Sequence, residues 1–157
     1  MPFFACGERY DNVLFTPYLP TVWRVNFVTV NFVGRKAMEL NMSEYLDFAK
    51  KIADILNEKK AKDIKIMEVG KVSGICDFFV FCNGTSTTHV KALADEIDVK
   101  LKEEGIMPHH LEGYRHANWI LLDYSSVVVH IFLEEMRDYY KLERLWADAE
   151  IMDYDAD

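Results

Sequence analysis

Along residues 43–146, segments whose apolar residues have helical spacing alternate with segments whose apolar residues have strand spacing. Together they predict an α/β chain. Apolar residues recur every three or four positions in 43–58, 86–105 and 134–146, the spacing of amphipathic helices, and Ser43 and Ser86 stand where caps are preferred. Strictly alternating or continuously apolar runs predict strands at 64–69, 77–82, 107–111, 119–123 and 127–132. This order predicts a single domain in which a mixed β-sheet is flanked by helices.

The strand pair 119–123 and 127–132 carries the most specific pattern. If Ser125-Ser126 forms a two-residue turn, Trp119 lies opposite Phe132, and Leu121 lies opposite His130. One face of the hairpin is then entirely aliphatic and is the predicted core. The other face is typical of a protein-interaction surface, and it combines Trp119, Leu121, Asp123, Val128, His130 and Phe132. The alternative is that a helix covers this face and that His130 is a hydrogen-bonded core histidine.

Motifs that would carry catalysis or bind a cofactor are weak. Residues 83–86 (Asn-Gly-Thr-Ser) lack the lysine of a phosphate-binding loop, so a tight turn that caps the following helix is the preferred interpretation. Asp77 and Asp123 flank strands without forming a closely spaced carboxylate pair. His109 and His110 would face opposite sides of a strand. We therefore expect no catalytic residues, no cofactor and no metal site.

Residues 1–37 differ in composition from the rest of the chain. They hold three of the four prolines, five of the ten phenylalanines and only six charged side chains. They match neither a secretory signal nor a mitochondrial transit peptide. The pattern at 22–33 suits a β-strand, and another interpretation places the natural start at Met38 or Met42. The expected organisation is an extension at 1–37, a domain at 38–147 and an acidic tail at 148–157.

Charge and cysteine content limit the classes of partner and the kind of compartment that we expect. The chain of 157 residues has 18 basic and 26 acidic side chains; residues 1–37 hold four of the former and two of the latter, which leaves 38–157 a net charge of −10. An acidic domain is expected to bind little nucleic acid directly. Five acids in the last ten residues predict a solvated, frayed tail, or alternatively one that steers toward a basic partner. Three cysteines without a CxxC pair favour a reducing compartment, and no apolar run suggests membrane insertion.

Residues 45–146 resemble the ribosomal silencing factor family, also called the Iojap-related family. The match covers roughly two thirds of the chain, and its segments stand in one order. They are Asp77-Phe78-Phe79-Val80, Gly84-Thr85-Ser86, Val90-Lys91-Ala92-Leu93-Ala94, Glu112-Gly113, and residues 119–124, 127–132 and 137–146. The resemblance implies a nucleotidyltransferase-like fold without its catalytic carboxylates, in a protein that is not an enzyme.

The resemblance also implies a function and a binding site. It implies a translational repressor that binds the large ribosomal subunit through its fourteenth protein, which is basic and subunit-facing, and blocks joining of the small subunit. With the hairpin register, it assigns partner contacts to Trp119, Leu121, His130, Phe132, Tyr139, Tyr140, Leu142 and Glu143. A second copy of the chain is a further candidate partner. The expected location is the cytoplasm, with an organelle matrix or stroma as the alternative.

A small nucleotidyltransferase or nucleotide-binding enzyme of the same fold is the competing hypothesis. It would need two acidic side chains two residues apart at a strand end, facing a Gly-Ser turn. The adjacent pairs Glu103-Glu104 and Glu134-Glu135 do not have that spacing.

Residues 1–37 are predicted to be dispensable, because the recognised pattern begins after them. We expect residues 38–157, expressed alone, to fold and to bind the large ribosomal subunit as the full chain does. Thermal unfolding and co-sedimentation with purified subunits measure both properties. A truncated chain that does not fold would show that the segment contributes an element of the domain.

Overall fold

The computed structural model describes residues 42–154 and contains a helix or strand at each predicted position, although the helix expected at 134–146 is divided in two and the strand expected at 107–111 is shorter. The helices are α2 (Met42–Glu58), α3 (Thr87–Glu103), α4 (Glu134–Tyr140) and α5 (Leu142–Leu145). The strands are β1 (Lys62–Glu68), β2 (Phe78–Gly84), β3 (His110–Glu112), β4 (Trp119–Asp123), β5 (Val127–Leu133) and β6 (Glu150–Asp153). The expectations for residues 1–37 lie outside the described residues.

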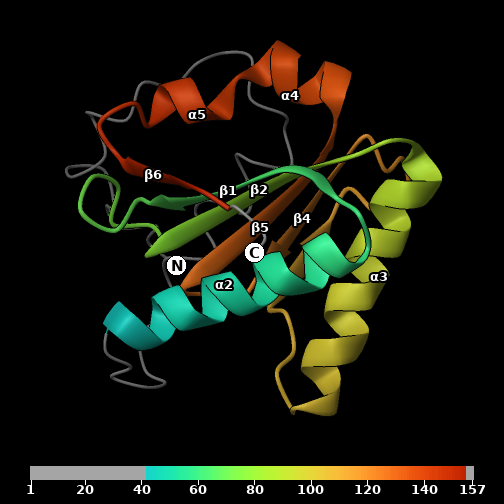
Figure 1. Cartoon of the computed structure of the whole chain (residues 1–157), viewed down its shortest axis with the longest axis horizontal. Coiled ribbons are helices and arrows are strands. Elements are labelled where there is room, and N and C mark those ends of the chain that lie inside the picture. The colour runs from blue at the N-terminus through green and yellow to red at the C-terminus, as the bar shows by residue number, and fades with distance from the viewer. Residues whose placement is uncertain (1–41, 155–157) are drawn as a thin grey trace, which may run out of the picture.

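These strands form one mixed sheet in the order β3-β4-β5-β2-β1-β6. The central strands β2 and β5 pair in parallel, and the other described pairs are antiparallel. Helices α2 and α3 cover one face of the sheet, and α4 and α5 lie on the other (Figure 1). The α/β class, with a mixed sheet flanked by helices, is therefore confirmed.

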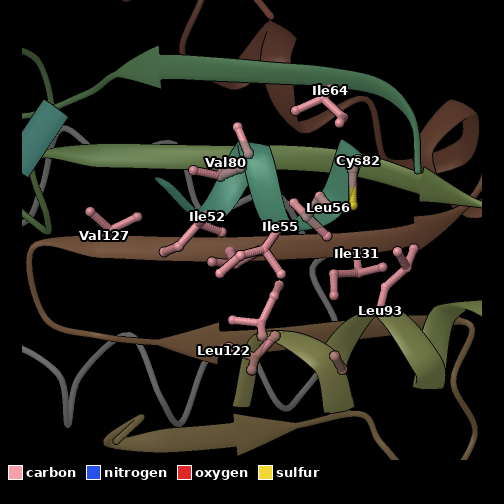
Figure 2. Packing of buried hydrophobic residues seen from close by; sticks show 14 of the residues in the cluster. Ile52, Ile55, Leu56, Ile64, Val80, Cys82, Leu93, Leu122, Val127 and Ile131 are labelled. Atoms are coloured by element: carbon pink, nitrogen blue, oxygen red, sulfur yellow. The ribbon is translucent and has the colours of Figure 1, made fainter. Parts of the chain in front are cut away.

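The first core lies between the sheet and the pair α2 and α3. Ser86 is the N-cap of α3, and its side chain accepts a hydrogen bond from the His89 amide, as the sequence predicted. Figure 2 shows the aliphatic side chains of this layer; Ile52 and Leu93 come from the two helices, and Val80 comes from β2. The aliphatic face of the hairpin, which includes Leu122 and Ile131, is buried here as expected.

Two local expectations are corrected. Asn83 and Gly84 are the last residues of β2 and do not form a turn. A Cβ atom on Gly84 would lie 2.6 Å from Val90 Cγ2, so the glycine permits the first turn of α3 to pack closely on the strand. The acidic tail is not frayed throughout, because Glu150–Asp153 forms β6 on the edge of β1. Met152 and Tyr154 pack on the first core, while the acids of this edge strand face solvent.

The single helix expected at 134–146 is broken at Lys141, which is another correction. Lys141 has φ 46°, in the left-handed region, and it separates α4 from α5. In an unbroken helix, residues 137 and 143 would be about 240° apart around the axis and would face different sides. The break brings them together: Arg137 Nε donates to Glu143 Oε1 at 2.7 Å. It also lets Leu142 reach the interior, where it is 1% exposed.

Replacing Lys141 by glycine is expected to raise the free energy of unfolding by about 0.5–1 kcal/mol, because glycine adopts positive φ without a Cβ clash. In a domain of this size, that raises the melting temperature by about 2–6 °C. Lys141→Val is expected to lower it, since a β-branched residue tolerates this conformation poorly. Thermal unfolding followed by circular dichroism measures both variants. A Lys141→Gly variant that melts no higher than the parent would show that the break stores no strain.

Candidate functional site

The predicted hairpin register is confirmed residue by residue. Trp119 pairs with Phe132, Leu121 with His130, and Asp123 with Val128. These six residues share the sheet face that is turned away from α2 and α3. The turn needs a left-handed residue, Ser125 with φ 69°, whose amide donates to Asp123 Oδ1 at 2.8 Å.

This face is not the exposed surface that was expected. Helices α4 and α5 lie over it, and a second core forms between them and the sheet. His130 and Phe132 are fully buried, and Leu121 and Leu142 are 8% and 1% exposed. The expectation that these four side chains are accessible to a partner is therefore wrong for this structure. The alternative interpretation, a helix over the face and a hydrogen-bonded core histidine, describes what is present.

His130 stands inside an aromatic stack. Its ring is stacked on Phe81, with centroids 5.0 Å apart, and meets Phe79 edge-on at 5.0 Å. The indole Nε1 of Trp119 donates to His130 Nδ1 at 3.3 Å. Burial lowers the pKa of His130 to about 3, and the charge of Arg137 adds to that shift. The ring is therefore neutral at physiological pH and serves as an acceptor for Trp119.

The accessible part of the predicted site is a smaller aromatic cluster. Trp119 is partly buried; its ring stacks on Phe132 at 4.8 Å and lies 5.3 Å from Tyr140. Tyr140 is also partly buried and meets Tyr139 edge-on at 5.0 Å. Tyr139 is 66% exposed. We call Trp119, Tyr139 and Tyr140 the aromatic cluster. It connects the first residue of β4 to the last turn of α4.

Sequence reasoning missed two residues of α4 and α5. Leu145 on α5 is an apolar side chain that is 38% exposed. Arg137 is 6% exposed, and its guanidinium bonds Glu143, the carbonyl oxygen of Asp63 at 2.7 Å and Asn83 Oδ1 at 3.0 Å. The role of Arg137 has no signal in the local pattern, because its acceptor Asp63 is 74 residues away along the chain.

Three of the residues considered for metal or phosphate chemistry make structural contacts. Asn83 faces Arg137, and Ser86 caps α3. Burial raises the pKa of Asp123, whose carboxylate accepts from the turn amide of Ser125. Within residues 42–154, no three His, Cys, Asp or Glu side chains gather where they could hold a metal ion. In the same part of the chain, no helix is long and apolar enough to cross a membrane.

The fold and this geometry define an α/β domain whose candidate site is a partly exposed aromatic cluster at the edge of the second core. The family model described as ribosomal silencing factor during starvation matches residues 42–157. The chain is 38% identical to the ribosomal silencing factor RsfS of Bacillus subtilis over 116 residues, which cover 74% of this chain and 96% of that protein. This chain belongs to the ribosomal silencing factor family, whose names indicate ribosome-associated regulators.

Two further similarities agree with this family. A crystal structure from Bacillus halodurans matches with a TM-score of 0.62 at 34% identity, over 69% of this chain and 99% of that chain. A mouse protein named mitochondrial assembly of ribosomal large subunit protein 1 is 30% identical over 100 residues, which cover 60% of this chain and 43% of that protein. The family therefore has members with bacterial and with organellar names.

The buried neutral His130 predicts a specific loss of stability in acid. The folded pKa is about 3, whereas an unfolded histidine titrates near 6.5, so only the unfolded state takes up this proton between those values. Stability from neutral His130 is complete above about pH 6.5 and is lost progressively below it, by about 2 kcal/mol at pH 5. His130→Gln does not titrate and keeps an oxygen acceptor for Trp119. The parent loses about 2 kcal/mol between pH 7 and pH 5 that the variant does not lose. The difference in free energy of unfolding between parent and variant should therefore become smaller by about 2 kcal/mol over that range.

Urea unfolding of both proteins at the two pH values measures that change. Other acidic groups titrate in both proteins, and their contributions cancel in the comparison. A deficit that stays constant with pH would mean that His130 takes up its proton equally in the folded and unfolded states.

Proposed function

We propose that this chain represses translation by binding the large ribosomal subunit at its fourteenth protein and blocking the small subunit from joining. Membership of the ribosomal silencing factor family supports a ribosomal role. The mouse relative, whose name refers to assembly of the ribosomal large subunit, supports the choice of subunit. The contact surface is argued from this chain's own residues.

The observation that carries the proposal is the exposed aromatic cluster. Tyrosine and tryptophan are enriched at the centres of protein interfaces, because they bury a large area and lose little rotamer freedom. Tyr139 on α4 is two-thirds exposed. Its ring is not buried, although a core rich in aromatic side chains lies between α4 and the sheet. Trp119 and Tyr140 form a rigid support behind it, since their rings also pack on the second core.

Charge around the cluster favours a basic protein as the partner. Glu134, Glu135 and Asp138 are exposed on α4, the same helix that presents Tyr139. Residues 38–157 as a whole are strongly acidic. Such a surface repels bare phosphate backbone and attracts a lysine- and arginine-rich protein, and it speeds the encounter most at low salt. A ribosomal protein exposed at the subunit interface fits these requirements better than ribosomal RNA does.

Repression of this kind requires occupancy and no chemical step. A folded domain seated on the subunit-facing side excludes the small subunit by its volume alone, so the extent of repression follows the bound fraction. We therefore propose that the protein is not an enzyme and needs no cofactor. We place it in the compartment of its ribosomes, the cytoplasm for a bacterial chain, whereas the mouse relative carries a mitochondrial name.

Tyr139→Ala is expected to weaken binding to purified large subunits about tenfold or more, because it removes an exposed aromatic contact. The melting temperature is expected to change by less than about 2 °C, since the side chain contributes little to the core. Co-sedimentation with each purified subunit measures binding, and light scattering after mixing both subunits measures their joining. The parent chain is expected to sediment with the large subunit alone and to reduce joining.

The matched control is Val99→Ala, which truncates an apolar side chain that is 53% exposed on α3, on the opposite face of the sheet. It is expected to bind as the parent does. If the parent sediments with neither subunit, the proposed function is wrong. If Tyr139→Ala binds normally, the partner contacts a different surface.

A further inference from the structure

Arg137 makes a dense set of polar contacts for one buried side chain. Nε donates to Glu143 Oε1 at 2.7 Å, and Nη1 donates to Asp63 O at 2.7 Å and Asn83 Oδ1 at 3.0 Å. Nη2 lies 3.1 Å from Asp63 Oδ2, and the guanidinium carbon is 5.9 Å from the centre of the Phe81 ring. The side chain therefore ties α4 to α5, to β1 and to β2 at once. Its planar fork has a fixed geometry, so these four elements are held in one arrangement.

Two residues with left-handed backbone contact Arg137, one through its guanidinium and one through its backbone carbonyl. Asp63 has φ 48° and stands where the register between β1 and β2 shifts, between Lys62 and Lys65. Lys141 has φ 46°, and its amide donates to the Arg137 carbonyl at 2.8 Å. Left-handed backbone at a residue other than glycine is costly and persists where the surroundings over-determine it. Arg137 is the neighbour that the two residues share: Asp63 presents its carbonyl and its carboxylate to the guanidinium, and the Lys141 amide bonds the Arg137 carbonyl.

The arrangement held by Arg137 decides where the aromatic cluster stands. Tyr139 and Tyr140 lie two and three residues after Arg137 in the last turn of α4, before the break at Lys141. The Tyr140 ring contacts Trp119. A rotation or shift of α4 would therefore carry both tyrosines relative to Trp119. Interface side chains tolerate little misplacement before affinity falls.

One carboxylate oxygen of Glu143 is already bonded to Arg137. Its side chain is 21% exposed, and Oε1 is the acceptor of the short charge-assisted bond from Arg137. A basic partner would have to compete with Arg137 for this group. The sequence placed Glu143 among the partner contacts, and the geometry favours an indirect role for it.

We propose that Arg137 is a positioning residue for the protein-binding surface, and that Glu143 supports partner binding through Arg137 and not by touching the partner. This inference rests on the proposed function, because it assumes that the aromatic cluster is the contact surface. It assigns the break between α4 and α5 a purpose, which is to fix Tyr139 and Tyr140 against Trp119.

A pair of substitutions at Glu143 tests the proposal without changing Arg137. Glu143→Gln keeps an oxygen acceptor for Nε, so it is expected to bind large subunits within about threefold of the parent. Glu143→Ala removes the acceptor and is expected to bind about tenfold more weakly. If Glu143 attracted a basic partner by its charge, the two variants would lose affinity equally. Glu103→Ala, which removes one exposed acid from α3, provides the control for charge alone.

A double-mutant cycle provides the second test. Arg137→Lys keeps the charge but loses the fork, and in that background Glu143→Ala is expected to have no further effect on affinity. Additive effects of the two substitutions would overturn the proposal. If Arg137→Lys does not fold, Asn83→Ala replaces it; because Asn83 supports the same guanidinium from β2 while the bond to Glu143 remains, the two effects are then expected to be less than additive. Binding is compared at a temperature well below the melting point of each variant.

A measurement on the free protein separates positioning from overall stability. Because the Tyr140 ring lies 5.3 Å from that of Trp119, its ring current acts on the Trp119 indole N–H resonance. That resonance is expected to shift in Glu143→Ala and to stay in place in Glu143→Gln. An unshifted resonance in Glu143→Ala would overturn the proposal. Parent protein that does not bind the large subunit would instead overturn the proposed function, so the two failures are distinguishable.

Discussion

The parallel pairing of β2 with β5 places two strands in the middle of the sheet whose side chains need cover on both faces. On one face, α2 and α3 bury an aliphatic layer that alternates along these strands. On the other face, the same strands present Phe79, Phe81, His130 and Phe132, and within residues 42–154 the helices α4 and α5 cover them. Burying aromatic area of this kind contributes about 2 kcal/mol or more for each side chain. The position of the short helices α4 and α5 is a consequence of this demand.

Covering the second face removes His130 and Arg137 from water, and each of them then needs polar partners nearby. A histidine in an aromatic interior must be neutral, and His130 becomes the acceptor of the Trp119 indole. A guanidinium near it must be paired, and Arg137 finds oxygen atoms on β1, β2 and α5. Two left-handed residues, Asp63 and Lys141, bring these acceptors within reach. The backbone strain at these two residues and the buried charge of Arg137 therefore belong to one arrangement.

The same arrangement supports the proposed role as a regulator that acts through its surface. The second core holds the inner edges of Trp119 and Tyr140, while Tyr139 stands in solvent beside the exposed acids of α4. A surface built on packed helices and strands loses little entropy on binding, which favours affinity from a small contact area. Membership of the ribosomal silencing factor family is consistent with this interpretation, since the proposed repression by occupancy would need a rigid surface and no reaction.

The sequence by itself determined the features that depend on neighbours along the chain. The hairpin register at 119–133, its aliphatic face and the Ser86 cap follow from a two-residue turn, a period of two and a preferred capping residue. Tertiary structure decided the rest. Tryptophan, histidine and phenylalanine together suit an interface or a core equally, and the choice depended on where α4 came to lie. The break at Lys141 and the pairing of β6 with β1 also required partners from distant parts of the chain, because a helical pattern and an acidic tail carry no information about them.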